Sequence, residues 1–132
     1  MTFEEAHYCI KRGDIASLTR SLQSGLDPNL ANKFSWTLLM LAAIAGNTGI
    51  GRVLVSCGAN VDATNDFGES ALSLAAHKGH MMFVNWLVNI GANRHCRPHG
   101  RNLDDWLKEV SGLPPKTISA VLGLLRDQQT FH

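Results

Sequence analysis

Short apolar stretches with helical spacing alternate along the chain with polar segments that are rich in turn-forming residues. The polar segments cover residues 26–36, 59–69 and 92–101. Outside them, apolar residues recur at intervals of three and four, which is the spacing of one helix face. The last third shows this most clearly, in Leu103, Trp106, Leu107 and Val110 and again in Ile118, Val121, Leu122 and Leu125. The pattern predicts an all-helical chain with turn-rich connections.

Two series of glycines share one period. One series is Gly13, Gly46, Gly79 and Gly112, and the other is Gly25, Gly58 and Gly91, with 33 residues from each glycine to the next. A fixed period of this length is typical of a stacked array, in which each unit covers the apolar face of its neighbour.

The two central copies, residues 32–64 and 65–97, resemble the ankyrin repeat family. Each contains a tight turn, two helical segments and a Gly-Ala-Asn sequence. His80 matches the histidine of the family's Gly-His pair, and Asn47 takes its place in the earlier copy. The resemblance implies an all-α fold: an ankyrin-like helical repeat solenoid with hairpin fingers and diverged terminal capping repeats.

The family's Thr-Pro-Leu-His motif is altered in both copies. It reads Thr-Leu-Leu-Met at 37–40 and Ser-Ala-Leu-Ser at 70–73. The proline that begins the helix and the histidine that hydrogen-bonds across the turn are both missing. We therefore expect a stack that is less rigid than an idealised one.

The repeat register divides the chain into four units within a single domain. Residues 1–31 form an N-terminal capping repeat, 32–64 and 65–97 are full repeats, and 98–132 form diverged C-terminal capping helices. Terminal units of a solenoid must close its apolar ends, which explains why they diverge.

Local signals predict several details of this array. Thr2 and Glu5 fit a capping box, so a helix should begin at once. Asp66-Phe67-Gly68 suits the positive φ of a finger tip, whereas Ser35 occupies the place of Gly68 in the finger before. Core packing or structural hydrogen bonds are expected of Cys9, His80, Trp86 and Trp106.

Composition favours a soluble intracellular protein. The net charge is +1, so no global attraction to nucleic acid or a membrane is expected. Three widely spaced cysteines argue against a disulfide framework, and the acidic N-terminal segment does not fit a secretory signal. We expect a complete, monomeric protein in the cytoplasm, the nucleus or both.

The resemblance implies that a concave face, built from the fingers and the first helix of each pair, binds partner proteins. Phe34, Trp36 and Phe67 are large apolar residues on adjacent fingers, which is typical of interface hot spots. An alternative is that Phe34 and Trp36 pack across their own hairpin. Carried over by register, the partner-binding candidates are Lys33, Phe34, Trp36, Ile44 and Ala45 in one unit and Asp66, Phe67, Glu69, His77 and Lys78 in the next.

Two sharper hypotheses concern the chemistry of the partner. Trp36, Phe34 and Phe67 with Glu69 would form an aromatic cage for a methyl-lysine-bearing peptide, resembling the histone-reading ankyrin domains. Arg94, Arg97 and Arg101 would hold an acidic peptide or phosphate groups, unless this segment is simply a solvated basic loop.

Neither a metal site nor an active site is expected. His95, Cys96 and His99 lack a fourth ligand at the spacing that structural zinc requires. The sequence contains no nucleophile beside a base at motif spacing and no glycine-rich phosphate loop. We therefore expect no enzymatic activity and no cofactor.

These expectations lead to a protein–protein interaction module, acting as an adaptor or as an inhibitor similar in size to the four-repeat cyclin-dependent kinase inhibitors. The alternative is a chromatin or nucleic-acid-associated reader that uses the aromatic cage or the basic finger. The near-zero charge makes nucleic acid a minor alternative, and no membrane partner is expected.

Overall fold

A computed structural model describes residues 1–110 and 112–127 of the chain. This part is helical, with the two isolated β-bridges Ala31–Thr37 and Thr64–Ser70 and no longer strand. The helices are α1 (Phe3–Arg12), α2 (Ile15–Gln23), α3 (Leu38–Ala45), α4 (Thr48–Ser56), α5 (Ala71–His77), α6 (Met81–Asn89), the 3₁₀ helix η1 (Pro98–Gly100), α7 (Leu103–Val110) and α8 (Pro115–Asp127).

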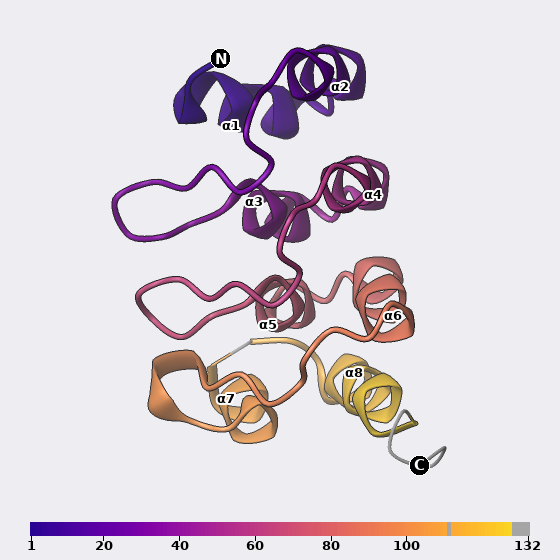
Figure 1. Ribbon diagram of the computed structural model, residues 1–132. Coiled ribbons are helices and arrows are strands. Elements are labelled where there is room, and N and C mark those ends of the chain that lie inside the picture. The colour runs from indigo at the N-terminus through magenta and orange to yellow at the C-terminus, as the bar shows by residue number, and fades with distance from the viewer. Residues whose placement is uncertain (111, 128–132) are drawn as a thin grey trace.

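The helices stack in two columns (Figure 1). One column contains α1, α3, α5 and α7, the other contains α2, α4, α6 and α8, and the connections before α3 and α5 project sideways as long fingers. The predicted all-α solenoid with hairpin fingers is confirmed. The unit boundaries within it stay predictions, and residues 111 and 128–132 of the last unit lie outside the described part.

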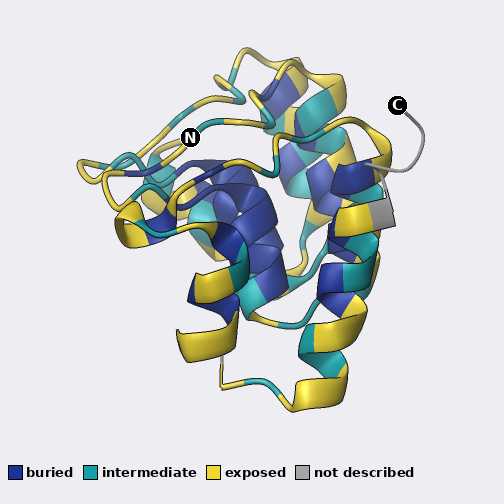
Figure 2. Cartoon of the chain, turned by 90° about the horizontal axis from the view of Figure 1, so that it is seen from below, coloured by how far each residue is buried: buried dark blue, intermediate teal, exposed yellow. Residues whose placement is uncertain are grey.

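The core lies between successive layers, and its centre is formed by α3 and α5. Five of the eight residues of α3 are buried, and so are six of the seven residues of α5 (Figure 2). Small residues such as Ala42, Ala43, Ala75 and Ala76 are fully buried there. They allow α3 to contact α1 on one side and α5 on the other. None of the helices in the described residues has the length and apolar character needed to cross a membrane.

Capping hydrogen bonds begin the helices where the sequence predicts them. The Glu5 amide donates to Thr2 Oγ1 at 3.2 Å, and the Thr2 amide donates to Glu5 Oε1 at 3.1 Å, so the predicted capping box is present. The hydrogen bond from the Thr2 backbone is the main reason why the pKa of Glu5 lies below its usual value.

The altered family motif still caps its helices. The Ser70 amide donates to Ser73 Oγ at 2.8 Å, and the Thr37 amide lies 3.5 Å from the sulfur of Met40. In return, the amides of residues 73 and 40 donate to the hydroxyls of Ser70 and Thr37. Ser73 and Met40 thus supply the turn-spanning contact that the missing histidine would make, and the predicted loss of rigidity stays a prediction.

Adjacent fingers are joined by one backbone hydrogen bond each. The Asp66 amide donates to the Phe34 carbonyl at 3.0 Å, and the His99 amide donates to the Phe67 carbonyl at 2.7 Å. At the tips, Gly68 has a φ of 75° and Ser35 a φ of 67°, so the first finger keeps the left-handed turn of the second despite its side chain.

The side chains assigned to packing take that role. Cys9 and Trp106 are buried, and Trp86 is half-buried with its ring edge-on to Phe83 at 5.2 Å between centroids. His80 Nε2 lies 2.9 Å from the Ile44 carbonyl oxygen, which accepts its hydrogen bond. His80 therefore ties the start of α6 to the last turn of α3.

Candidate functional site

The concave face is the surface formed by the fingers together with α1, α3, α5 and α7. The fingers project from the side of this helix column (Figure 1). The hollows on this face include one between α1 and α3 and one between α5 and α7.

The α1–α3 hollow has a volume of about 640 Å³. Six of its nine lining residues are apolar, and the three polar ones are His7, Lys11 and Asn32. The apolar lining comprises Phe3 and Ile10 of α1, Trp36 of the first finger, and Leu41, Ile44 and Ala45 of α3. The sequence-predicted residues Trp36 and Ile44 are thus brought together here.

An asparagine folds each of the first two fingers. Asn32 Oδ1 accepts hydrogen bonds from the amides of Phe34 and Trp36, both at 3.0 Å. Asn65 Oδ1 accepts from the amides of Phe67 at 2.9 Å and Glu69 at 3.1 Å. The two asparagines therefore hold the fingertip aromatics in equivalent positions, one repeat apart.

The α5–α7 hollow has a volume of about 380 Å³ and is lined by Glu69, His77, His99, Arg101, Trp106 and Val110. The Trp106 ring lies 5.0 Å from that of His77 and 6.2 Å from that of His99. Burial lowers the pKa of His77, and its Nδ1 is buried without a hydrogen-bond partner among the described residues. A neutral imidazole is therefore favoured at this position.

Glu69 is held inside the protein rather than presented to a partner. It is only 8% exposed, and Asn65 Nδ2 donates to its Oε1 at 2.9 Å. Its other oxygen lies 3.5 Å from His99 Nε2. The carboxylate thus joins the second finger to the third.

An aromatic row crosses the three fingers. The ring centroids of Phe34 and Phe67 are 6.4 Å apart, those of Phe67 and His99 are 5.8 Å apart, and Lys33 Nζ lies 5.2 Å from the Phe34 ring. Phe34 is 46% exposed and Phe67 43% exposed. Phe34 therefore packs on the next finger while keeping half its surface free, and Trp36 turns into the α1–α3 hollow.

The four residues of the hypothetical methyl-lysine cage do not share one hollow. Trp36 lines the α1–α3 hollow, whereas Glu69 lines the α5–α7 hollow, where it is already hydrogen-bonded. A cage needs its carboxylate and its aromatic faces around the same cation. In this arrangement they are not gathered around one point.

Two of the three arginines in the basic segment serve the C-terminal unit. Arg94 donates to the carbonyl of Leu125 in α8, and Arg101 forms an ion pair with Glu109. Arg97 donates to the Gly100 carbonyl at 2.9 Å. The hollow beside them, of about 410 Å³, also contains Asp104 and Asp105, so its charge is mixed.

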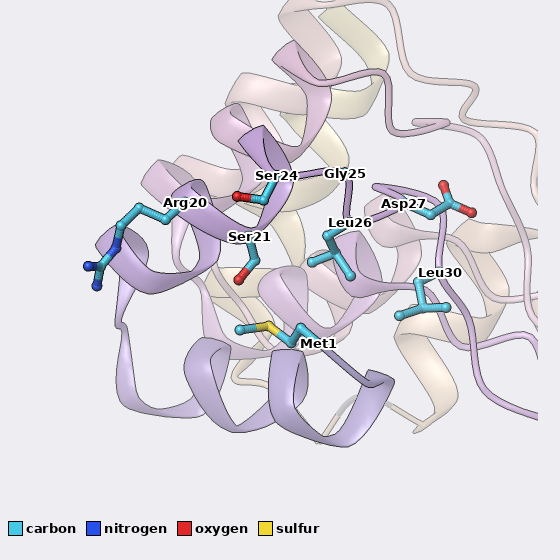
Figure 3. A pocket seen from close by; sticks show the side chains of 8 residues that line it. All are labelled: Met1, Arg20, Ser21, Ser24, Gly25, Leu26, Asp27 and Leu30. Atoms are coloured by element: carbon cyan, nitrogen blue, oxygen red, sulfur yellow. The ribbon is translucent and has the colours of Figure 1, made fainter.

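A further hollow of about 520 Å³ lies near the N-terminus, between the end of α2 and the turn that follows it. Figure 3 shows Met1, Leu26 and Leu30 around it, with the Arg20 side chain directed away from them. No residue of this hollow was a predicted site residue.

Sequence reasoning also missed Asn32 and the α1 residues of the α1–α3 hollow. The sequence carries one signal for Asn32. Trp36 aligns with Glu69 of the next repeat, so Asn32 faces a different neighbour from Asn65. The remaining predicted residues, including Asp66 and Lys78 on the second finger and the end of α5, are not tested by the structure and stay predictions.

Comparison with known proteins also finds ankyrin repeats. A protein-family model for ankyrin repeats, in three copies, matches residues 6–97. Human palmitoyltransferase ZDHHC17 is 45% identical over 60 residues, which cover 45% of this chain and 10% of that protein.

Two other relatives match longer stretches. The DNA replication inhibitor plutonium of Drosophila melanogaster is 33% identical over 85 residues, covering 61% of this chain and 49% of that protein. Human ankyrin repeat and KH domain-containing protein 1 is 40% identical over 88 residues, covering 65% of this chain and 3% of that protein. The chain therefore matches no more than about half the length of these relatives.

Proposed function

The chain belongs to the ankyrin repeat family, and from this we propose that it is a protein-binding module that captures a partner through its concave face. Ankyrin repeats are generally protein–protein interaction modules, and solenoids use their extended concave surfaces for binding. The family is typically non-enzymatic, which agrees with a role in binding.

The observation that carries this proposal is the apolar surface left open on the concave face. Phe34 and Phe67 expose nearly half their surfaces on the fingers, and the α1–α3 hollow, which Trp36 of the first finger lines, is mostly apolar. Aromatic side chains next to a concave apolar surface with a polar rim are the usual anchors of protein interfaces. Lys33, Ile44, Asp66, His77 and Lys78 complete the proposed contact surface.

We propose that the protein acts in the cytoplasm or the nucleus, by one of two mechanisms that are consistent with such a surface. An inhibitor would block the partner by covering it, and an adaptor would join two partners. One relative is an inhibitor of DNA replication by its name, which favours the first mechanism.

Affinity capture from cell lysate tests the proposal, using wild type, Trp36→Ala/Phe67→Ala and Met82→Ala. Met82 is 80% exposed on α6, which lies in the helix column farther from the fingers, so it is the matched control (Figure 1). We expect a protein that is captured by wild type and Met82→Ala but lost with the double variant. Capture by all three folded proteins alike would argue against the concave face.

A chromatin or nucleic-acid reader is the less supported alternative. Arg94 and Arg101 are engaged within the C-terminal unit, and the net charge is +1. Such a reader should bind duplex or single-stranded probes in a gel shift, with steep salt dependence. We expect no shift in that assay.

A further inference from the structure

The first two fingers differ at one hydrogen bond. In the second finger, Asn65 Nδ2 donates to the Glu69 carboxylate at 2.9 Å. In the first finger the equivalent residue is Trp36, whose indole has a donor and no acceptor. The Asn32 side chain therefore lacks the carboxylate that its counterpart has.

The orientation of the Asn32 amide is fixed. The two backbone amides of Phe34 and Trp36 both point at one atom of this side chain, and that atom must be the oxygen because it accepts from both. The Nδ2 group is thus directed away from the backbone of its own finger. The described part of the chain shows no hydrogen bond from Nδ2 to another residue, and Nδ2 is not among its buried polar atoms without a partner, so this donor is open to solvent.

The lining of the α1–α3 hollow includes Asn32 but no carboxylate. Asn32 lines this hollow together with Lys11 and His7, and none of the nine lining residues is acidic. Of the two acidic residues in the first turn of α1, Glu5 is held by the Thr2 cap and neither lines the hollow. The polar side of the hollow therefore presents a cation and a hydrogen-bond donor without a carboxylate to balance them.

We propose that the α1–α3 hollow binds a glutamate side chain of the partner protein. The glutamate carboxylate accepts a hydrogen bond from Asn32 Nδ2 and lies near the Lys11 ammonium group, while its methylene groups pack on Trp36 and Ile44. The partner thus supplies the carboxylate that Glu69 supplies in the next repeat. This inference rests on the proposed function, because it names the partner chemistry at the concave face.

The test uses the whole chain and a phage-displayed library of short random peptides, attached so that their own C-termini are not free. Peptides are selected on wild type and counter-selected on Asn32→Asp. This variant keeps an oxygen for the two finger amides and replaces the Nδ2 donor by an acceptor. We expect glutamate to be enriched, and its replacement by glutamine in the best synthetic peptide to weaken binding at least about tenfold.

Two further variants separate this contact from general electrostatics. Trp36→Glu places an internal carboxylate where the second finger has one, so it should fold and lose peptide binding at least about tenfold. Lys11→Gln should weaken binding more than Lys33→Gln, which removes the same charge from a fingertip outside the hollow. Circular dichroism confirms that each variant is folded.

The proposal is overturned if selected peptides show no acidic preference, or if none discriminates wild type from Asn32→Asp. It is also overturned if the glutamine peptide binds as tightly as the glutamate peptide. Binding through the concave face is tested separately from the glutamate site. A lysate protein that is lost with Trp36→Ala/Phe67→Ala but captured normally by Asn32→Asp would keep the concave face and exclude the glutamate site.

Discussion

Ser35 shows how one residue retains a turn that its side chain disfavours. Its φ of 67° matches the 75° of Gly68 one repeat later. The left-handed region costs an L-residue roughly 1–2 kcal/mol, and glycine loses roughly 0.5–1 kcal/mol more chain entropy on folding. We expect Ser35→Gly to raise the free energy of unfolding by about 0.5–1 kcal/mol in urea titration.

The reverse exchange at the second finger should be damaging. A Cβ at Gly68 would overlap with the carbonyl oxygen of Arg97, so both backbone conformation and space oppose a side chain. We expect Gly68→Ser to lower the free energy of unfolding by roughly 2 kcal/mol or more. If both exchanges changed the free energy of unfolding in the same direction, the two turns would not share one geometry.

His77 should make stability depend on pH. Burial lowers its pKa from 6.5, so below that pH the unfolded chain binds this proton more readily than the folded protein does. The contribution of the neutral His77 to stability is therefore fully present above pH 6.5 and is lost as the pH falls below it. The charges of Lys78 and Glu69 also act on this group, the first lowering the pKa of His77 and the second raising it.

His77→Phe keeps an aromatic ring against Trp106 and removes the titration. Thermal unfolding between about pH 7.5 and about pH 5 should therefore show a smaller loss of stability in the variant than in wild type. Parallel curves for the two proteins would contradict the assignment to His77.

At the level of the helices, α4 contains two glycines that differ in how closely neighbouring atoms approach them. A Cβ at Gly51 would lie 2.8 Å from Trp86 and 3.0 Å from Phe83, whereas at Gly49 the nearest atoms are 3.4 Å and 3.5 Å away. Alanine in place of a helix glycine gains about 1 kcal/mol of propensity, and overpacking costs about 1–3 kcal/mol. We expect Gly49→Ala to stabilise the protein and Gly51→Ala to destabilise it.

Denaturant unfolding of these two variants checks the packing of α4 against α6. The helix propensity is common to both exchanges, so their difference isolates the contact with the aromatic rings. Stabilisation by both would mean that α6 packs farther from α4 than the structure shows.

Most of the elements could be predicted because their signals are local. The 33-residue glycine period and the Thr2–Glu5 cap indicated helices that the structure contains. The third finger was harder, because Pro98 replaces the asparagine that folds the first two and cannot offer a side-chain oxygen. Its contacts, such as Arg94 with Leu125, join residues 31 positions apart, which no local pattern reveals.

The candidate site was predictable only in part for the same reason. Phe34 and Phe67 could be placed on the fingers by register, and the structure leaves both half exposed. Glu69 was interpreted as a contact residue, but its burial depends on Asn65 and on His99 from the next finger. The basic segment looks free in the sequence because its partners, Glu109 and the end of α8, lie farther along the chain in the C-terminal unit.

At the scale of the whole molecule, the two faces of the solenoid differ in what they offer a partner. The concave face combines the α1–α3 and α5–α7 hollows with the exposed aromatics of the fingers. Because the net charge is only +1, attraction to a partner must come from local groups such as Lys11 and Lys33. Binding should therefore depend on the geometry of the concave face more than on overall charge.

Site-specific photo-crosslinking in cells shows directly whether a partner protein lies on the concave face. A photoreactive phenylalanine derivative replaces Phe67 on the concave face in one protein and Met82 on α6 in another, since both side chains are exposed. We expect a covalent adduct with a partner protein from position 67 and none from position 82. An adduct from position 82 alone, or equal adducts from both, would contradict binding through the concave face.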